Sequence, residues 1–237
     1  MNHPLPTGNF SCFVTGTDTE IGKTLVSAAL LYILVQRGVQ VAAMKPVAAG
    51  AEWRNGAWHN DDADMLAHSA NVPLPPTLTT PYLLRTPAAP HIAAAIDKVV
   101  IDPAHIQQCF NHVRTQCEAV IVEGVGGFRV PLTDHFDTAD LAQQLALPVI
   151  LVAGLRLGCI SQALLTVEAI QVRGLQLMGW VANTVDPHMG HVAANLQALA
   201  QRIPAPLLGH IPRLLEPSAS VAASFIGTQD HTASNDA

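Results

Sequence analysis

Apolar residues in this chain gather into six short continuous runs, each separated from the next by a longer and more polar stretch. Within the runs, apolar and polar positions do not alternate. Strands buried on both faces show this pattern, whereas a strand with one solvated face would alternate. We therefore predict six buried strands, at residues 12–16, 39–47, 118–124, 148–154, 177–185 and 206–212.

Segments with helical patterning lie between these runs. Gly38 and Gly174 end two of them, which is typical of a helix that stops in a left-handed residue. Alternation of strands and helices predicts an α/β fold, with a mostly parallel sheet, helices on both faces and ligands at the carboxyl ends of the strands. The predicted helices are Thr24–Arg37, Asp61–Ser69, Pro103–Cys117, Thr138–Leu145, Ser161–Arg173 and roughly Pro187–Arg202.

Neither an internal repeat nor a change of composition divides the chain. We therefore interpret residues 1–237 as one α/β domain, since this length is ordinary for a single domain. The proline-rich stretch 71–90 interrupts the alternation of strands and helices, and we interpret it as an ordered connecting segment. From about Val221 the residues are small and polar, so we expect a flexible tail.

The charge balance argues against a nucleic-acid-binding protein. Lys and Arg number 12 and Asp and Glu 18, a formal net charge of −6, and the basic residues form no run. The four cysteines form no CxxC pair and fit no zinc spacing, so we expect reduced thiols in a reducing compartment. We see no signal peptide and no apolar stretch of the ~20 residues that span a bilayer. These features predict a cytoplasmic protein without membrane or nucleic-acid partners.

The first predicted strand leads into VTGTDTEIGKT, residues 14–24. A strand, a glycine-containing loop and Gly22-Lys23-Thr24 opening a helix form the context of a P-loop. Backbone N–H groups there bind phosphates, the lysine adds a charge and the threonine can bind Mg²⁺. The usual spacing is GxxxxGK[ST], but Gly16 lies one residue too early and Thr17 takes its position. A strand-to-helix turn that binds no phosphate is the alternative. A lysine without a bound anion would be unfavourable there, because the N-terminus of a helix carries a partial positive charge.

The longer loop, GTDTxxGKT, resembles that of the dethiobiotin synthetases. Other segments resemble the same family in the same order, over roughly residues 10–217. The resemblance implies a P-loop NTPase-like fold, a homodimer, ATP as co-substrate and Mg²⁺. The segments are KPVAAG (45–50), NDDADML (60–66), PAAPHIAA (87–94), VEGVGG (122–127), LPVILVAGLRLGCIS (147–161), GWVANTV (179–185) and IPAPLLGHIP (203–212).

Charged residues follow several predicted strands. Lys45 closes the second strand, where it would point into the crevice beside the P-loop or lie solvated at the strand end. Glu123 ends a buried run before glycines, like a Walker B carboxylate near Mg²⁺, although it could instead cap a neighbouring helix. Asp62 lies where a helix begins, a common place for aspartate. Asp61 and Asp64 fit equally well on the residues alone.

The family resemblance assigns roles to these residues. It implies that Lys45 and Lys23 are catalytic, and it selects Asp62 among the aspartates. Thr24, Asp62 and Glu123 would then offer three oxygen ligands to Mg²⁺, with phosphates and water completing the octahedron. The implied nucleotide-binding residues are Glu20, Ile21, Gly22, Lys23, Thr24, Leu25, Asp62, Glu123, Gly124, Val125, Gly126, Asn183, Thr184, Ile211, Pro212, Arg213 and Glu216.

Two further segments contribute candidate binding residues. Asn183 ends a predicted strand, and its amide could pair with an adenine edge or simply close the strand into a turn. Ser161 could N-cap the next helix, with or without a carboxylate on the free N–H groups. The resemblance implies a substrate carboxylate there, bound partly by the neighbouring subunit. The implied substrate-binding residues are Ala49, Leu157, Gly158, Cys159 and Ser161.

Two positions depart from the family pattern. Many members have serine where Ala49 stands and histidine where Gln162 stands. The family's serine contacts the substrate. Alanine cannot make that hydrogen bond, but the backbone N–H groups remain, so we expect the reaction to be retained.

The reaction implied by the resemblance is ATP-dependent carboxylation and ring closure of 7,8-diaminononanoate. One amine takes up CO₂ as a carbamate, ATP phosphorylates the carbamate, and the second amine displaces phosphate to give dethiobiotin. One alternative is a ParA/MinD-like ATPase switch, but the loop lacks an early second lysine and no basic amphipathic C-terminal helix is visible. Another is an amidase-coupled P-loop ligase, for which the chain is too short to include a glutaminase domain.

Overall fold

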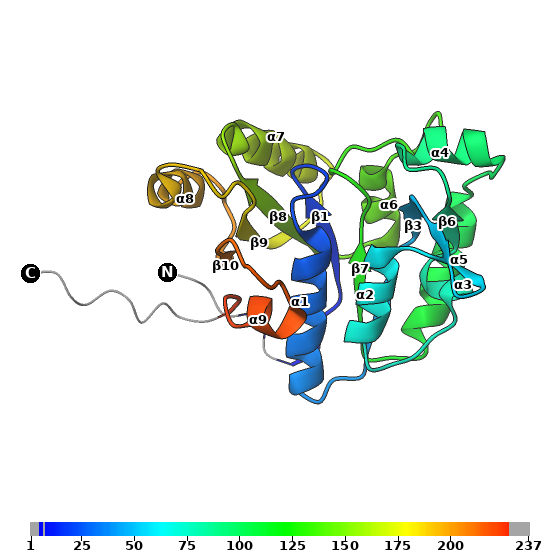
Figure 1. Cartoon of the computed structure of the whole chain (residues 1–237). Coiled ribbons are helices and arrows are strands. Elements are labelled where there is room, and N and C mark those ends of the chain that lie inside the picture. The colour runs from blue at the N-terminus through cyan, green and yellow to red at the C-terminus, as the bar shows by residue number, and fades with distance from the viewer. Residues whose placement is uncertain (1–4, 7, 228–237) are drawn as a thin grey trace, which may run out of the picture.

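The computed structural model describes residues 5–6 and 8–227 of the chain. In these residues a parallel six-stranded sheet has the strand order β10-β9-β8-β1-β7-β2. Helices cover both of its faces (Figure 1), which confirms the predicted α/β fold. The strands are β1 (Cys12–Gly16), β2 (Val41–Met44), β7 (Ala119–Glu123), β8 (Val149–Leu155), β9 (Leu177–Thr184) and β10 (Leu207–Ile211).

The predicted second strand is two separate strands. β2 ends at Met44, and the backbone N–H of Lys45 donates to the carbonyl of Thr79 (2.8 Å) instead of to the sheet. Pro46 has no N–H to continue the ladder. The chain then enters β3 (Val47–Ala49), which pairs with β6 (Tyr82–Leu84) in a small sheet of its own.

The predicted helices are all present, with changes at some ends. α7 begins at Cys159, before the predicted start, and α8 begins at Val192, well after Pro187. The segment before α8 is a turn that ends in His191, whose φ of 57° is left-handed. The helices are α1 (Lys23–Gln36), α2 (Asp61–Ser69), α5 (Pro103–Arg114), α6 (Thr138–Leu145), α7 (Cys159–Val172) and α8 (Val192–Ala200).

Successive residues of each strand pack into cores on opposite faces of the sheet. Val14 of β1 belongs to the core that includes Leu30 of α1, whereas Phe13 packs with Phe110 of α5. Trp180 of β9 lies in a third cluster, beneath α7 and α8. Both faces of the sheet are therefore covered, which explains why the strand sequences are continuously apolar.

The connection between β2 and β7 holds short elements that the hydrophobic pattern did not predict. Its strands are three residues long, too short for a periodicity to be visible. The proline-rich stretch within it is ordered, as expected, because Pro76 and Pro90 occupy the first turns of two helices. The elements not yet named are β4 (Glu52–Arg54), β5 (Ala57–His59), α3 (Pro76–Thr79) and α4 (Pro90–Asp97).

The prediction of a flexible tail from Val221 is wrong for residues 221–227. Helix α9 (Ala219–Ala223) packs against α1, and Ala222 and Ile226 are buried in the same core as Leu30. Small alanines allow this close helix packing despite the polar residues around them. Residues 228–237 lie outside the described part of the chain. None of the described helices has the length and hydropathy needed to cross a membrane.

Gly209 offers a test of this C-terminal packing. A Cβ there would lie 2.1 Å from the carbonyl oxygen of Phe225 and 2.9 Å from the Cα of Ile226. Both are backbone atoms, so Gly209→Ala should displace the segment and lower the free energy of unfolding by about 2 kcal/mol. Urea unfolding followed by circular dichroism measures this. Gly190→Ala is the control, since a Cβ there meets nothing within 4 Å. Equal stability of both variants would contradict the packing.

Candidate active site

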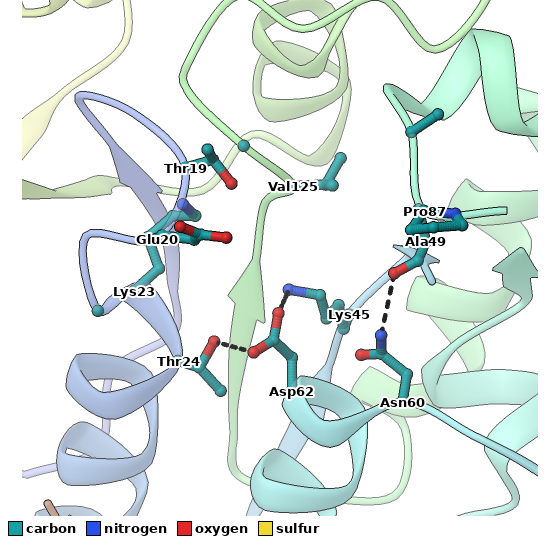
Figure 2. A pocket seen from close by; sticks show the side chains of 13 residues that line it. Thr19, Glu20, Lys23, Thr24, Lys45, Ala49, Asn60, Asp62, Pro87 and Val125 are labelled. Atoms are coloured by element: carbon teal, nitrogen blue, oxygen red, sulfur yellow. Dashed lines mark hydrogen bonds and ion pairs between the residues drawn. The ribbon is translucent and has the colours of Figure 1, made fainter. Parts of the chain in front are cut away.

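A cavity of about 530 Å³ lies at the carboxyl ends of the central strands. The chain passes from β7 across β1 to β8, so the strand order reverses around β1, where α/β sheets bind ligands. Figure 2 shows the P-loop on one side of the cavity and α2 and β3 on the other. The lining residues are Thr19, Glu20, Gly22, Lys23, Thr24, Lys45, Ala49, Asn60, Asp62, Pro87, Ala88, Val125 and Gly126.

The P-loop is held in place by Ile21, which is buried beneath it. A Cβ on Gly16 would lie 2.7 Å from the Ile21 side chain, and a Cβ on Gly154 would lie 2.5 Å from it. Both glycines therefore leave the room that Ile21 fills. Gly22 has a φ of 86°, and a Cβ there would lie 2.2 Å from Nδ2 of Asn183. That amide nitrogen donates to the carbonyl of Ile21 (2.8 Å).

Lys23 curls back over the loop that carries it. Its Nζ donates to the backbone carbonyl of Asp18 at 2.8 Å, and the side chain is 6% exposed. Burial lowers the pKa of Lys23 to about 8, an effect that the nearby carboxylate of Glu123 opposes and Lys45 reinforces. Lys23 therefore remains largely an ammonium at neutral pH and loses its proton as the pH rises through about 8.

Lys45, Asp62 and Glu123 form a charge cluster in which Lys45 and Glu123 are buried and the side chain of Asp62 is 47% exposed. Nζ of Lys45 lies 2.5 Å from Oε1 of Glu123 and 2.8 Å from Oδ2 of Asp62. The hydroxyl of Thr24 lies 2.7 Å from Oδ1 of Asp62 and 3.1 Å from Oε1 of Glu123. Figure 2 shows Thr24 and Lys45 each contacting a different carboxylate oxygen of Asp62. The structure thus brings together all the residues predicted to be catalytic or metal-binding.

The ion pairs keep this cluster charged. Burial by itself would lower the pKa of Lys45, but Glu123 and Asp62 outweigh it and raise that pKa. Burial likewise would raise the pKa of Asp62, yet Lys45 and the hydroxyl of Thr24 bring it below its usual range. Lys45 is therefore an ammonium and Asp62 a carboxylate at neutral pH.

The structure decides among the three aspartates of α2. Asp61 and Asp64 turn away toward the β4–β5 hairpin, where Arg54 pairs with Asp61 at 2.7 Å and His59 contacts Asp64 at 3.0 Å. Asp62 is rotated by about 100° around the helix from Asp61, which directs it into the cavity.

Asn60 is a site residue that the sequence analysis missed. Its Oδ1 accepts from the N–H of Ala63 and caps α2, and its Nδ2 donates to the carbonyl of Ala49 (3.1 Å). It therefore joins the helix that carries Asp62 to the wall of the cavity. Its position before an aspartate-rich helix start was a visible N-cap signal.

The donor set around Thr24 fits Mg²⁺. The oxygens come from the hydroxyl of Thr24 and the carboxylates of Asp62 and Glu123, and hard divalent cations prefer such ligands. Glu123 is 0% exposed, and its Oε2 is buried with no hydrogen-bond partner among the described residues. An unpaired buried carboxylate oxygen of this kind calls for a cation.

The other predicted nucleotide-binding residues fall into two groups. In the first group, Glu20, Val125 and Gly126 line the cavity. Gly124 packs against Phe13, and Leu25 of α1 packs against the core. The second group lies at the ends of β9 and β10 and does not line the cavity. In that group Thr184 contacts His210 (2.9 Å), and Arg213 donates to the carbonyl of Val185 (3.3 Å). Ile211, which precedes Pro212, is buried, whereas Glu216 is exposed.

The predicted substrate-binding residues lie in two places. Ala49 lines the main cavity, whereas Leu157, Gly158 and Ser161 line a separate open groove at the start of α7, and Cys159 is buried beneath it. The prediction that Ser161 caps α7 is wrong. Gly158, with a φ of 92°, is the N-cap residue, and no side chain caps the helix.

Comparison with known proteins identifies the family. A family model described as an AAA domain matches residues 11–220. The ATP-dependent dethiobiotin synthetase of Janthinobacterium sp. (strain Marseille) is 61% identical over 224 residues, which cover 93% of this chain and 95% of that protein. This chain belongs to the dethiobiotin synthetase family. Another member, from Aromatoleum aromaticum, is 57% identical over 90% of this chain and 95% of its own length.

Solved structures show the same fold at low sequence identity. The signal recognition particle 54 kDa protein of Aeropyrum pernix K1 gives a TM-score of 0.57 at 15% identity, covering 93% of this chain and 46% of that one. The MinC:MinD complex of Aquifex aeolicus gives 0.56 at 14%, covering 90% and 92%. At such identities the likeness shows the fold alone. It confirms the P-loop NTPase-like fold of this dethiobiotin synthetase family member.

The lowered pKa of Lys23 predicts a pH-dependent affinity for nucleotide. A bound phosphate favours the ammonium form, so the pKa of Lys23 rises in the complex and ADP binding takes up a proton above pH 8. ADP affinity should be steady below pH 8 and fall above it by up to about tenfold per pH unit. Calorimetry in buffers of different ionisation enthalpy measures both effects. In Lys23→Arg the slope should disappear, because arginine stays charged. An affinity unchanged to pH 10 would exclude a pKa near 8.

Proposed function

We propose that the protein is a cytoplasmic, homodimeric enzyme that carboxylates 7,8-diaminononanoate and closes its ring at the expense of ATP. The products are dethiobiotin, ADP and phosphate. The observation that carries the proposal is the buried ammonium of Lys45, held on Asp62 and Glu123 beside the P-loop. It stands in a cavity large enough for both triphosphate and diamine. The names of the relatives, ATP-dependent dethiobiotin synthetases, support the same reaction.

The proposed chemistry proceeds in three steps. An amine nitrogen of the substrate attacks CO₂, loses a proton and becomes a carbamate. A carbamate oxygen then attacks the γ-phosphorus of ATP, breaking its bond to the bridging oxygen and releasing ADP. The second amine attacks the carbonyl carbon and loses a proton, and the C–O bond to phosphate breaks, so that the cyclic urea forms and phosphate leaves. Phosphorylation is needed because oxide is a poor leaving group, whereas phosphate is a good one.

The chain's own residues position and neutralise charge in these steps. Lys45 would hold the carbamate oxygens in line with the γ-phosphate, and Lys23 would neutralise the phosphoryl oxygens. The backbone N–H groups of the loop and of the start of α1 would bind the phosphates. Such fixed charges and dipoles need no rearrangement at the moment of reaction.

Thr24, Asp62 and Glu123 are proposed to hold Mg²⁺. When bound, the ion neutralises the β- and γ-phosphates. The buried and unpaired Oε2 of Glu123 supports this assignment. The proposed adenine side of the site lies at the carboxyl ends of β9 and β10, on the far side of β8. It comprises Asn183, Thr184, Ile211–Arg213 and Glu216.

The dimer is proposed to form across the groove at the start of α7. Leu157 is 97% exposed and Leu165 is 65% exposed, and both line this groove. α7 is 14 residues long, and no side chain caps its N-terminus, which leaves N–H groups for an anion. The partner's substrate carboxylate is the proposed occupant. Ser161 would supply one of the free helical N–H groups, whereas the N–H of Cys159 already donates to the carbonyl of Arg156 (3.0 Å).

Substrate dependence tests the reaction. Phosphate release should require diamine and bicarbonate together, and mass spectrometry should find dethiobiotin in equal amount. Lys45→Ala should lower turnover by about 10²-fold or more, the size of an electrostatic contribution to phosphoryl transfer, and should change ADP affinity little. Lys45→Arg, which keeps a charge for Glu123, is the control for folding. It should also be slow, because its planar group cannot replace a compact ammonium. Full turnover in Lys45→Ala would remove this lysine from the mechanism.

A charge in the α7 groove tests the dimer. Leu165→Glu should yield a monomer in sedimentation velocity, since burying an unpaired carboxylate at an apolar interface is strongly unfavourable. Val172→Glu is the matched control. Val172 lies on the same helix and is 79% exposed, but it does not line the groove. A dimer that persists in Leu165→Glu would place the interface elsewhere.

A further inference from the structure

The first two residues of the P-loop are hydrogen-bonded and ion-paired to β8 and to the segment that leads from β8 into α7. The N–H of Thr17 donates to the carbonyl of Val152 (3.0 Å), and the N–H of Gly154 donates to the hydroxyl of Thr17 (3.3 Å). The carboxylate of Asp18 forms an ion pair with Arg156 and accepts from Nε2 of Gln162 (3.3 Å). We call these contacts of Thr17 and Asp18 the tether.

Asp18 connects the tether to Lys23. Its backbone carbonyl accepts from Nζ of Lys23 at 2.8 Å. Its Oδ1 accepts from the N–H of Thr19 (2.7 Å), which fixes the orientation of the carboxylate, while Oδ2 takes the contacts with Arg156 and Gln162. Any displacement of Arg156 therefore reaches the residue that holds the phosphate-binding lysine.

Arg156 connects the tether to the groove at the start of α7. It directly precedes Leu157 and Gly158, which line that groove, and Gln162 lies in the first turn of α7. Gly158 has a φ of 92°, a conformation that few residues other than glycine adopt. A ligand held by the N–H groups of α7 would restrict this connection, and with it the guanidinium of Arg156.

The tether also accounts for the unusual spacing of the loop. A standard P-loop has glycine where Thr17 stands, and glycine has no hydroxyl to accept from Gly154. The extra residue places both Thr17 and Asp18 beside β8. The Arg156–Asp18 pair is half-exposed, at 41% and 35%, so it adds little to stability. The pair instead fixes the position of Asp18 relative to Arg156.

We propose that Arg156 and Asp18 are positioning residues that couple the two subsites, so that a diamine carboxylate on α7 increases nucleotide affinity at the P-loop. The inference rests on the proposed function. In a dimer whose α7 binds the partner's substrate, the coupling runs between subunits. The ligand fixes the β8–α7 connection, Arg156 then fixes Asp18, and Asp18 holds Lys23 where the phosphates bind.

Calorimetric titration of the full-length protein with the non-hydrolysable analogue AMPPCP and Mg²⁺, with and without saturating diamine, measures the coupling. In the wild type, diamine should tighten analogue binding by about fivefold or more. Arg156→Met and Asp18→Asn should each bring this factor close to one. Asp18→Asn keeps an oxygen for the N–H of Thr19, so the loop should retain its shape. The double variant should match the singles, because all three lack the same interaction.

Arg54→Met is the matched control. Arg54 is 40% exposed and ion-paired with Asp61, and it lies away from the tether. Its removal should leave the coupling intact. Circular dichroism and melting temperature confirm the fold of each variant.

Several results would overturn the proposal. They are wild-type protein without coupling, coupling retained in either single variant, losses that add in the double variant, or an equal loss in Arg54→Met. A single variant that weakens analogue binding equally with and without diamine would show a role in nucleotide binding alone, and would also overturn it. Dethiobiotin formation by the wild type is measured in parallel. Its absence would refute the proposed function, whereas turnover with an unchanged coupling in the variants would refute only the tether.

Discussion

The buried carboxylate of Glu123 is the constraint on which the site depends. It ends the strand beside β1 and is 0% exposed, and a charge in such a place needs a cation. Lys45 supplies that cation, with its Nζ 2.5 Å from Oε1 of Glu123. The same ammonium also forms an ion pair with the carboxylate of Asp62. The cluster joins the residue that follows β2 to the last residue of β7 and to the first turn of α2.

A second constraint is steric, and it shapes the P-loop from below. Ile21 fills the space left by Gly16 and Gly154, and Asn183 occupies the space that a side chain on Gly22 would need. The loop is therefore packed against residues near the carboxyl ends of three strands, β1, β8 and β9. A loop held in this way offers its backbone N–H groups in a preformed arrangement, which is how a phosphate site gains affinity without reorganisation.

These two constraints divide the carboxyl edge of the sheet into neighbouring regions. Lys45, Asp62 and Ala49 lie on the β2 side of the P-loop, in the main cavity. Arg156 lies on the β8 side, directly before the open apolar groove that Leu157, Gly158 and the start of α7 line. The proposed reaction would use both regions, one for the phosphates and the reacting amines and the other for the substrate carboxylate. Residues 17 and 18 are bonded across the boundary between them.

Much of this architecture follows from the order of residues. Continuous apolar runs predict strands buried on both faces, and the letters GKT after the first run predict a phosphate site, because both signals are local and strong. Lys45 and Glu123 were also predictable, since each stands at the end of a run. The three-residue strands β3 to β6 and the packed segment at 221–227 were not predictable, because they depend on contacts made by distant parts of the chain.

The sequence by itself determined the fold class, the family resemblance and the residue types that carry charge. Only the tertiary structure decided which aspartate faces Thr24, that Asn60 ties α2 to the cavity wall, that Gly158 rather than Ser161 is the N-cap residue of α7, and what Thr17 and Asp18 touch. The reason is geometric. Local periodicity reports which face of an element is buried, whereas the partner of a polar side chain depends on elements brought near it from elsewhere in the chain.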